Sequence, residues 1–250
     1  MVQFPEQIGL KLFSPLLSYE TATPVCSVAL LQADGTIIRR QAEGKGVHSE
    51  LIFVFTDELL REAGLVVADL GGVIVSAGPG SYTGLRVAAS AVKGLLFNTE
   101  IPLYACHTLG GFALGIFQDG SFGTADTVMD ARRSHLYHQA WVQDEHGIRP
   151  ETKVALMDLK AVQELRNRGR LVFGTGLDRL ESGRIQKRNI NSDDSDVDVM
   201  ENMGVAMPVS EVVDAGHILK EVSQGSKKTL HNLLKKVAPE QFEPYYYSGL

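Results

Sequence analysis

Small and hydroxyl-bearing residues stand where an apolar segment ends, and residues of these types can bind phosphate. Residues 73–75 are apolar, and they are followed by Gly78, Gly80 and Ser81 and then by a stretch rich in small side chains. Backbone amides at the start of a helix carry partial positive charge and donate hydrogen bonds to anions. The chemistry to consider first is therefore the binding of a phosphate or a nucleotide at this turn.

The spacing of these glycines does not fit the phosphate-binding motifs. A Walker A loop needs G-x-x-x-x-G-K-[ST], whereas Gly78 and Gly84 are one residue too far apart and no lysine follows. The dinucleotide pattern G-x-G-x-x-G also fails by one residue, and no serine of the turn has the flanking glycines of a nucleophile elbow. We favour a strand-to-helix turn that Ser81 or Thr83 caps.

Histidines and cysteines could also carry chemistry, but their spacing argues against a local site. His135 and His138 lie three residues apart in a predicted strand and therefore point to opposite faces of it. Neither Cys26 nor Cys106 belongs to a CxxC pair, which excludes a four-cysteine zinc site. We interpret both as buried free thiols of a reducing compartment, and His48 as a capping or surface residue.

The composition is that of an ordinary globular chain. Its 250 residues are 22% charged and 44% hydrophobic, and the net charge is −6. That charge gives no electrostatic reason for independent binding to nucleic acid or to an anionic membrane. No stretch of 18 apolar residues and no convincing signal peptide is present, so we expect a cytoplasmic protein without a membrane segment. The arginines of the charged turn at residues 130–133 could contact a phosphate or a partner carboxylate, but we favour a solvated turn.

The elements that position these residues follow an α/β order. Apolar runs predict strands at 16–19, 26–31 and 36–38, and Asp34-Gly35 between the last two is a hairpin signal, so the chain begins with an antiparallel meander. A helix at 50–63, a buried strand at 69–75, the helix after the glycine turn and a strand at 101–106 follow. This order predicts an α/β fold with mixed strand pairing. In the second half we predict strands at 127–129, 135–142 and 171–173, and helices at 159–168, 209–222 and 229–237.

The helix that follows the glycine turn is apolar or small on nearly every face. Its apolar residues recur at the spacing of a helix, and Arg86 and Lys93 are its long polar side chains. Such a helix is usually covered on both sides, by its own sheet and by something else. The pattern therefore indicates a partner surface as well as a core contact.

Six segments of the chain form a recognisable series: ETATPVCSVALL (20–31), HSELI (48–52), GPGSYTGLRVAASAVKGL (78–95), IPLYACHTL (101–109), MDARRSHLY (129–137) and EPYYY (243–247). In this order they resemble the TsaB family, also called YeaZ, the bacterial accessory proteins for threonylcarbamoyladenosine formation on tRNA. The Gly-Pro-Gly turn with its helix is the most specific of them. The similarity is strong from about residue 18 to 109 and again near Asp130, and it is weak from 143 to 242.

The resemblance implies an actin-like (ASKHA, ribonuclease H-like) fold of two lobes with mixed sheets. The N-terminal lobe would span 1–109 with an extension at 1–15, and the C-terminal lobe 110–250 with an acidic loop at 189–202. In this superfamily the first strand usually ends in an aspartate followed by a glycine. In this chain Glu20 replaces the aspartate, and no glycine follows it. The two-histidine metal motif of the related catalytic subunit, TsaD, is also missing. The resemblance thus implies a non-enzymatic paralogue that holds no metal or cofactor alone, with ATP or ADP only at a junction with a partner.

The family's partner surface is the pair of N-lobe helices, here residues 50–63 and 83–98. They would bind a TsaD-like catalytic subunit, or a second copy in a homodimer. With a TsaE-like ATPase the complex would form N6-threonylcarbamoyladenosine at position 37 of tRNA. This chain would bind tRNA only as part of that complex. A stand-alone actin-like ATPase or kinase, and a metallopeptidase, are the alternatives. The predicted interface residues are Leu51, Phe55, Leu59, Leu85, Ala88, Ala89, Val92 and Lys93.

Overall fold

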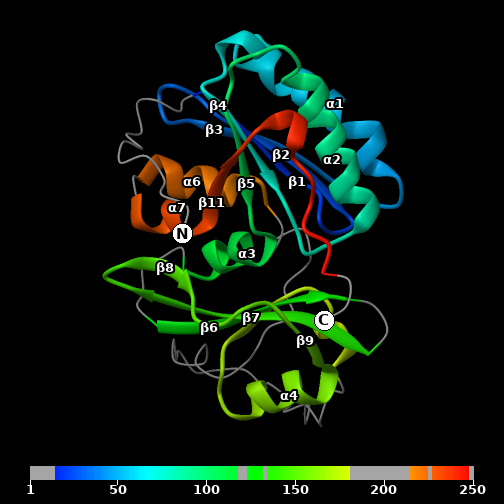
Figure 1. The fold of residues 1–250 in the computed structure, drawn as a ribbon, viewed down its shortest axis with the longest axis vertical. Coiled ribbons are helices and arrows are strands. Elements are labelled where there is room, and N and C mark those ends of the chain that lie inside the picture. The colour runs from blue at the N-terminus through cyan, green and yellow to red at the C-terminus, as the bar shows by residue number, and fades with distance from the viewer. Residues whose placement is uncertain (1–14, 118–122, 132–133, 181–213, 225–226, 248–250) are drawn as a thin grey trace, which may run out of the picture.

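The computed structural model describes residues 15–117, 123–131, 134–180, 214–224 and 227–247. Two β-sheets, one above the other in Figure 1, form two lobes, and helices lie on and between them. Residues 1–14 and the predicted acidic loop at 189–202 lie outside the described residues. Within the described residues, the helices are too short or too polar to cross a membrane.

The first sheet has six strands in the order β11-β5-β4-β1-β2-β3. The first three strands pair antiparallel, which confirms the predicted meander, while β4 runs parallel to β1 and β5 parallel to β4. The mixed pairing predicted from the order of elements is thus confirmed. The strands are β1 (Leu16–Glu20), β2 (Val25–Leu31), β3 (Ile37–Glu43), β4 (Gly72–Ser76), β5 (Leu103–Cys106) and β11 (Leu234–Val237).

Successive side chains along these strands point to opposite faces of the sheet, so they contribute to two separate cores. Leu17 and Tyr19 of β1 face the core that lies under α1 and α2, whereas Leu16 faces the core shared with α3, α6 and α7. Helices therefore cover both faces of the first sheet (Figure 1). They are α1 (Val47–Glu62) and α2 (Tyr82–Leu95) on one side, and α3 (Thr108–Ile116), α6 (Gly216–Gln224) and α7 (Lys227–Leu233) on the other.

The second sheet pairs β10-β6-β7-β8, and β9 also pairs with β7. Its strands contain the segments predicted at 127–129 and 135–142 and, from Val172 on, the one predicted at 171–173, and α4 (Leu159–Asn167) confirms the predicted helix at 159–168. Short 3-10 turns lie at Val67–Asp69, Leu177–Arg179 and Pro239–Gln241. The strands are β6 (Gly123–Asp130), β7 (His135–Asp144), β8 (Gly147–Pro150), β9 (Ala155–Asp158) and β10 (Val172–Gly174).

The end of the chain differs from the prediction. Residues 229–237 are not one helix, because α7 ends at Leu233 and Leu234 begins β11, which pairs antiparallel with β5. Helix α6 begins at Gly216, and residues 209–213 of the helix predicted there lie outside the described residues. The sheet of the first lobe thus includes residues 234–237 as a strand. The predicted lobe boundary near residue 109 assigns these residues to the second lobe.

Candidate functional site

The glycine turn between β4 and α2 uses three of its backbone donors within the chain. The amide of Gly78 donates to Thr108 Oγ1 at 3.2 Å, and the amide of Ser81 donates to the carbonyl oxygen of Ala22 at 2.6 Å. The Ser81 hydroxyl accepts from the amide of Gly84 at 3.2 Å, which confirms Ser81 as the helix cap. Three amides of the turn are thus bonded to neighbouring parts of the protein and are not free to donate to a phosphate.

Glycine is required in this turn because two backbone segments meet there. A Cβ atom at Gly84 would lie 2.1 Å from the carbonyl oxygen of Thr21, and one at Gly80 would lie 2.5 Å from the Cβ of Ala22. Thr21 Oγ1 also donates to the carbonyl oxygen of Gly84 at 3.0 Å. The turn after β1 and the start of α2 therefore lie against each other directly, and the glycines provide the room for that contact.

Glu20, which ends β1, is a buried carboxyl group beside this contact. Its Oε1 accepts from the amide of Ala22 at 2.7 Å, and its exposed fraction is 8%. Burial raises the pKa of Glu20 from 4.5 to about 7, although hydrogen bonds from Ala22, Ser76 and Thr21 oppose this effect. The carboxyl group is therefore bonded to its own turn and titrates near neutral pH.

We expect the substitution Glu20→Gln to stabilise the fold above pH 7. The folded chain keeps the Glu20 proton up to about pH 7 and the unfolded chain loses it near 4.5, so stability falls as the pH rises between these values. Glutamine cannot ionise, and its Oε1 still accepts from Ala22. Urea denaturation should show a gain of about 3 kcal/mol at pH 8 that disappears as the pH falls below 4.5. A difference between the two chains that does not vary with pH would contradict this assignment.

A cleft of about 1020 Å³ lies between the lobes, where the N-termini of α1 and α2 meet residues of the second sheet. Its lining includes Lys45 and Tyr82 from the first lobe, and Asp130, Tyr137 and Arg179 from the second. Arg179 Nη1 donates to Asp130 Oδ1. The cleft is large enough for a small ligand, and it carries charges of both signs.

The sequence-predicted histidines have separate partners. His48 Nε2 bonds the carbonyl oxygen of Val25 at 3.1 Å, His138 Nε2 bonds Asp126 Oδ1 at 2.7 Å, and His135 is exposed. His135 and His138 thus face different sides of β7, as predicted. Within the part of the chain that the structure describes, His, Cys, Asp and Glu residues form no group of three or more able to hold a metal.

Both cysteines are free and buried, as predicted. Burial raises the pKa of Cys26 to about 11 and that of Cys106 to about 12, with the charge of Glu20 adding to the second. The two thiols are therefore protonated and unreactive at neutral pH.

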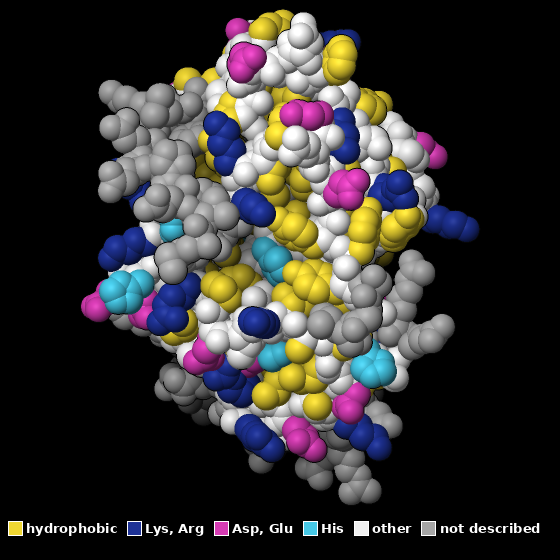
Figure 2. All heavy atoms as spheres, in the orientation of Figure 1, with side chains coloured by type: hydrophobic (Ala, Val, Ile, Leu, Met, Phe, Trp, Pro, Cys, Tyr) yellow, Lys and Arg dark blue, Asp and Glu magenta, His cyan; other side chains and the backbone are white. Residues whose placement is uncertain are grey.

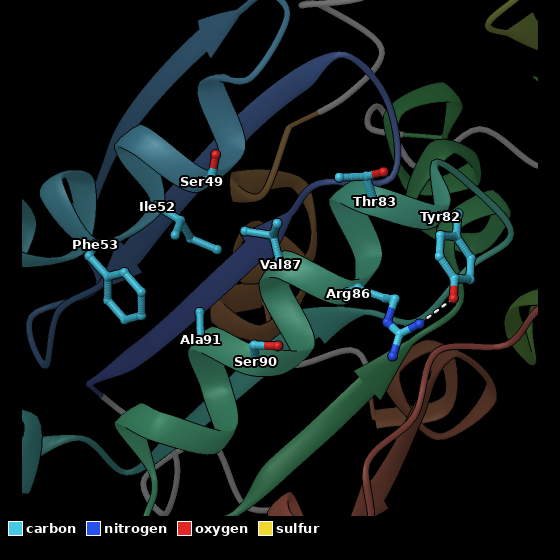
Figure 3. Close-up of a pocket in the computed structure, with 9 residues that line it drawn as sticks. All are labelled: Ser49, Ile52, Phe53, Tyr82, Thr83, Arg86, Val87, Ser90 and Ala91. Atoms are coloured by element: carbon cyan, nitrogen blue, oxygen red, sulfur yellow. Dashed lines mark hydrogen bonds between the residues drawn. The ribbon is translucent and has the colours of Figure 1, made fainter.

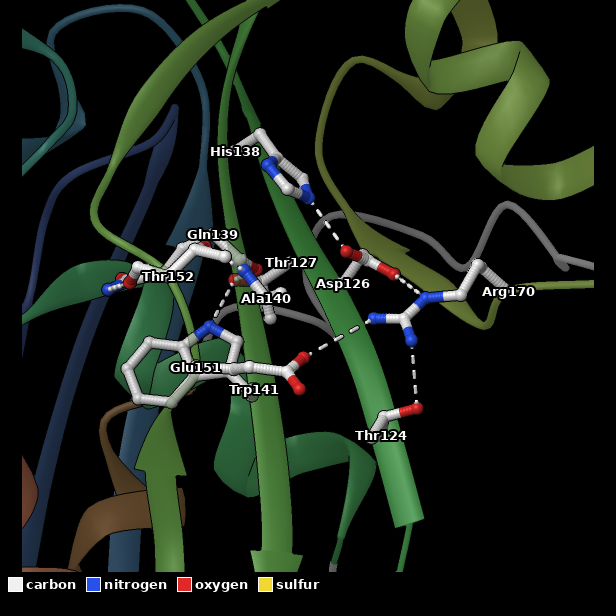
Figure 4. Close-up of polar contacts among 10 residues, drawn as sticks. All are labelled: Thr124, Asp126, Thr127, His138, Gln139, Ala140, Trp141, Glu151, Thr152 and Arg170. Atoms are coloured by element: carbon white, nitrogen blue, oxygen red, sulfur yellow. Dashed lines mark hydrogen bonds and ion pairs between the residues drawn. The ribbon is translucent and has the colours of Figure 1, made fainter.

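Sequence reasoning missed a buried polar cluster in the second sheet, shown in Figure 4. Asp126 of β6 is 1% exposed, and its carboxylate accepts from His138 at 2.7 Å and from Arg170 Nε at 2.7 Å. Burial opposes ionisation, yet these two hydrogen bonds hold the pKa of Asp126 below its usual value. The partners come from separate strands and a loop, so no local motif could reveal them, and their bonds to one another indicate a structural role.

A groove of about 430 Å³ runs between α1 and α2 on the outer side of the first lobe (Figure 3). Phe53 is 55% exposed, and Tyr82 is 54% exposed. Tyr82 accepts a hydrogen bond from Arg86, whose guanidinium also lies over the Tyr82 ring at 5.1 Å. The groove is mainly apolar, with an arginine at its rim. Its lining residues are Ser49, Ile52, Phe53, Tyr82, Thr83, Arg86, Val87, Ser90 and Ala91.

Residues 40–175 match the family model described as TsaD: tRNA N6-adenosine threonylcarbamoyltransferase. The tRNA threonylcarbamoyladenosine biosynthesis protein TsaB of Escherichia coli (strain K12) is 30% identical over 133 residues, 53% of this chain and 57% of that protein. The TsaB protein of Bacillus subtilis (strain 168) is 29% identical over 164 residues, 64% of this chain and 70% of its own length. The chain belongs to the TsaD family, on its TsaB (YeaZ) branch.

A solved structure of YeaZ from Pseudomonas aeruginosa has the same fold as this TsaB-family chain. The TM-score is 0.66 at 24% sequence identity, and the superposition covers 92% of this chain and 98% of the other. This likeness confirms the actin-like fold implied by the sequence resemblance. The sequence matches themselves span little more than half the length of the first curated relatives, 57% and 55%.

The structure divides the eight interface residues predicted for the TsaB-family chain into two groups. Five are buried in the core of their own chain, with exposed fractions of 6% or less, and three are half-buried. A partner could reach the five only if the helices left their sheet, so these five are core residues, and a partner surface on the exposed side of the same helices stays a prediction. The buried five are Leu59, Leu85, Ala88, Ala89 and Val92, and the half-buried three are Leu51, Phe55 and Lys93.

The charged turn predicted at residues 130–133 is described only in part. Asp130 is exposed and forms an ion pair with Arg179, which links β6 to the 3-10 turn after β10. Arg132 and Arg133 lie outside the described residues. In the TsaB-family chain this turn therefore borders the cleft through Asp130.

Proposed function

We propose that this chain is a non-catalytic scaffold and activator in the formation of N6-threonylcarbamoyladenosine at position 37 of tRNA. In this proposal it binds a TsaD-like catalytic subunit, and the transfer chemistry takes place in that partner. The family model and the TsaB relatives support the assignment to this process. The observation that carries the proposed role is the exposed apolar groove on α1 and α2.

The groove fits a helical partner. Phe53 and Val54 of α1 are exposed at 55% and 46%, and the neighbouring face of α2 carries the small exposed residue Ser90, with the buried Ala91 at the base of the groove. Small side chains allow a second pair of helices to approach closely, and an exposed aromatic residue beside them is a typical anchor of an interface. The same surface would support a homodimer when the catalytic subunit is absent.

The glycine turn supports the non-catalytic role. Its amides at Gly78, Ser81 and Gly84 are bonded to the chain itself, and the Glu20 carboxylate is bonded to the amide of Ala22. In an actin-like enzyme, groups at these positions would face the nucleotide. Here the three amides and the carboxylate stabilise contacts within the chain, including the one between the end of β1 and α2. We propose that any ATP or ADP binds at the junction with the partner rather than in this turn.

The charge distribution supports tRNA binding through the complex only. Lys and Arg side chains are interspersed with acidic and apolar ones on the described part of the face in Figure 2, and the net charge is −6. A surface of this kind does not attract a polyanion by itself. We propose that the catalytic subunit and a TsaE-like ATPase complete the tRNA-binding assembly, in the cytoplasm.

The test is reconstitution with the TsaD-like and TsaE-like proteins of the same organism, tRNA and the threonylcarbamoyl donor. We expect a stable complex in size-exclusion chromatography, and modified adenosine in amounts that depend on this chain. Calorimetry of the isolated chain with ATP and magnesium addresses the alternative, a stand-alone actin-like ATPase or kinase, which the cleft between the lobes would favour. Micromolar nucleotide binding and turnover by the isolated chain, without a complex, would overturn the proposal.

A further inference from the structure

The segment 242–247, near the end of the described chain, crosses from the first lobe to the second (Figure 1). Phe242 is 3% exposed and belongs to the core under α1 and α2. The amide of Tyr245 donates to the carbonyl oxygen of Ala77, just after β4, at 2.6 Å. The carbonyl oxygen of Tyr245 lies so close to Gly78 that a Cβ there would be 2.6 Å away. The first half of the segment is therefore fixed to the first lobe.

The next residue contacts the start of α2. The rings of Tyr246 and Tyr82 are 5.0 Å apart between centroids, at an interplanar angle of 42°. Tyr82 is held in turn by Arg86, one helical turn further along α2. Tyr82 lines the cleft between the lobes, so Tyr246 supports the first-lobe wall of that cleft.

Tyr247 contacts the opposite wall through its ring, whose centroid is 5.9 Å from that of Tyr137 on β7. Its hydroxyl lies 2.8 Å from Nε2 of His107, which follows β5 in the first lobe. Tyr137 lines the cleft from the second lobe. Burial lowers the pKa of His107 to about 4, so the imidazole that Tyr247 contacts is neutral at physiological pH. Tyr246 thus contacts Tyr82 of the first-lobe wall, and Tyr247 contacts Tyr137 of the second-lobe wall.

We propose that residues 242–247 form a strap that holds the two lobes together at the rim of the cleft and limits how far the cleft opens. The lobes also share a core that includes Leu16 of the first sheet and Trp141 of the second, so they stay joined when the strap is released. Release then changes the width of the cleft rather than the fold. This proposal does not depend on the identity of any partner.

The experiment measures the distance across the cleft by pulsed electron paramagnetic resonance. Spin labels are attached to cysteines introduced by Lys45→Cys and Asp178→Cys, two exposed positions that line opposite walls. The native cysteines are buried, and labelling of the parent chain checks that they stay unlabelled. In the double variant Tyr246→Ala and Tyr247→Ala we expect a longer and broader distance distribution. The amide of Tyr245 should also exchange with solvent about tenfold faster.

Two further variants separate the strap from a general loss of structure. Tyr245→Ala keeps the backbone amide that bonds Ala77, so it should leave the distance unchanged. Tyr247→Ala alone removes the ring that contacts Tyr137 of the second lobe and should give an intermediate distribution, even if the double variant does not fold. Distance distributions of the Tyr247→Ala chain and of a folded double variant that match the parent chain would overturn the proposal. So would a shift in the Tyr245→Ala chain equal to that of the double variant.

Discussion

A Phe53→Asp chain is expected to bind a TsaD-like subunit about 100-fold more weakly than the unsubstituted chain. Phe53 is exposed at the side of the α1–α2 groove, so the substitution leaves the core intact. In a complex, the new carboxylate would be removed from water within an apolar groove, which is strongly unfavourable without a partner charge. Isothermal titration calorimetry with the purified subunit measures the dissociation constant.

The matched control is Leu171→Asp. Leu171 is 47% exposed and lies just before β10 in the second lobe, away from the groove, so the same type of change should leave binding unaltered. Circular dichroism of both chains checks that they are folded. Equal affinity of the Phe53→Asp chain and the unsubstituted chain would place the partner surface elsewhere. Equal weakening by both substitutions would indicate a non-specific effect of charge.

The second large effect is expected at Gly84. In a Gly84→Ala chain the new Cβ would lie 2.1 Å from the carbonyl oxygen of Thr21, which is backbone and cannot rotate away. The start of α2 would have to separate from the turn after β1. We expect a loss of about 3 kcal/mol or more in the free energy of unfolding, measured by urea denaturation.

Gly94 provides the control within the same helix. A Cβ at Gly94 would meet no atom within 4 Å, so Gly94→Ala should be neutral or should stabilise the chain by up to about 1 kcal/mol, through helix propensity. If both substitutions had the same effect, the close contact between the two backbones would not be what requires glycine at position 84.

The sequence allows the first half of the fold to be predicted because its signals are local. Apolar runs and the Asp34-Gly35 turn identify the meander, and Ser81 or Thr83 is predicted to cap α2, which the structure shows to begin after Ser81. Helix α3 was not predicted, because Gly110, Gly111 and Gly115 weaken its helix propensity. It is stabilised by burial between the lobes, which only the folded structure reveals.

The candidate site shows a second limit of sequence reasoning. Periodicity identifies the face of α2 that is buried, and Ala88 and Val92 on that face pack on the chain's own sheet. The exposed residues beside them, such as Tyr82 and Ser90, have no periodic signal of their own. Contacts between residues far apart in the sequence also leave no local pattern. Examples are the pairing of β11 with β5 and the hydrogen bonds of the Asp126–His138–Arg170 cluster.

The pairing of β11 with β5 has a consequence for how the protein is made. During synthesis, β5 is an open sheet edge until residues 234–237 have left the ribosome, about 130 residues after it. An open edge is a site at which other chains can add a strand. The first lobe therefore cannot complete its folding during translation of the N-terminal half, and a fragment that ends near residue 109 would present that edge and tend to aggregate.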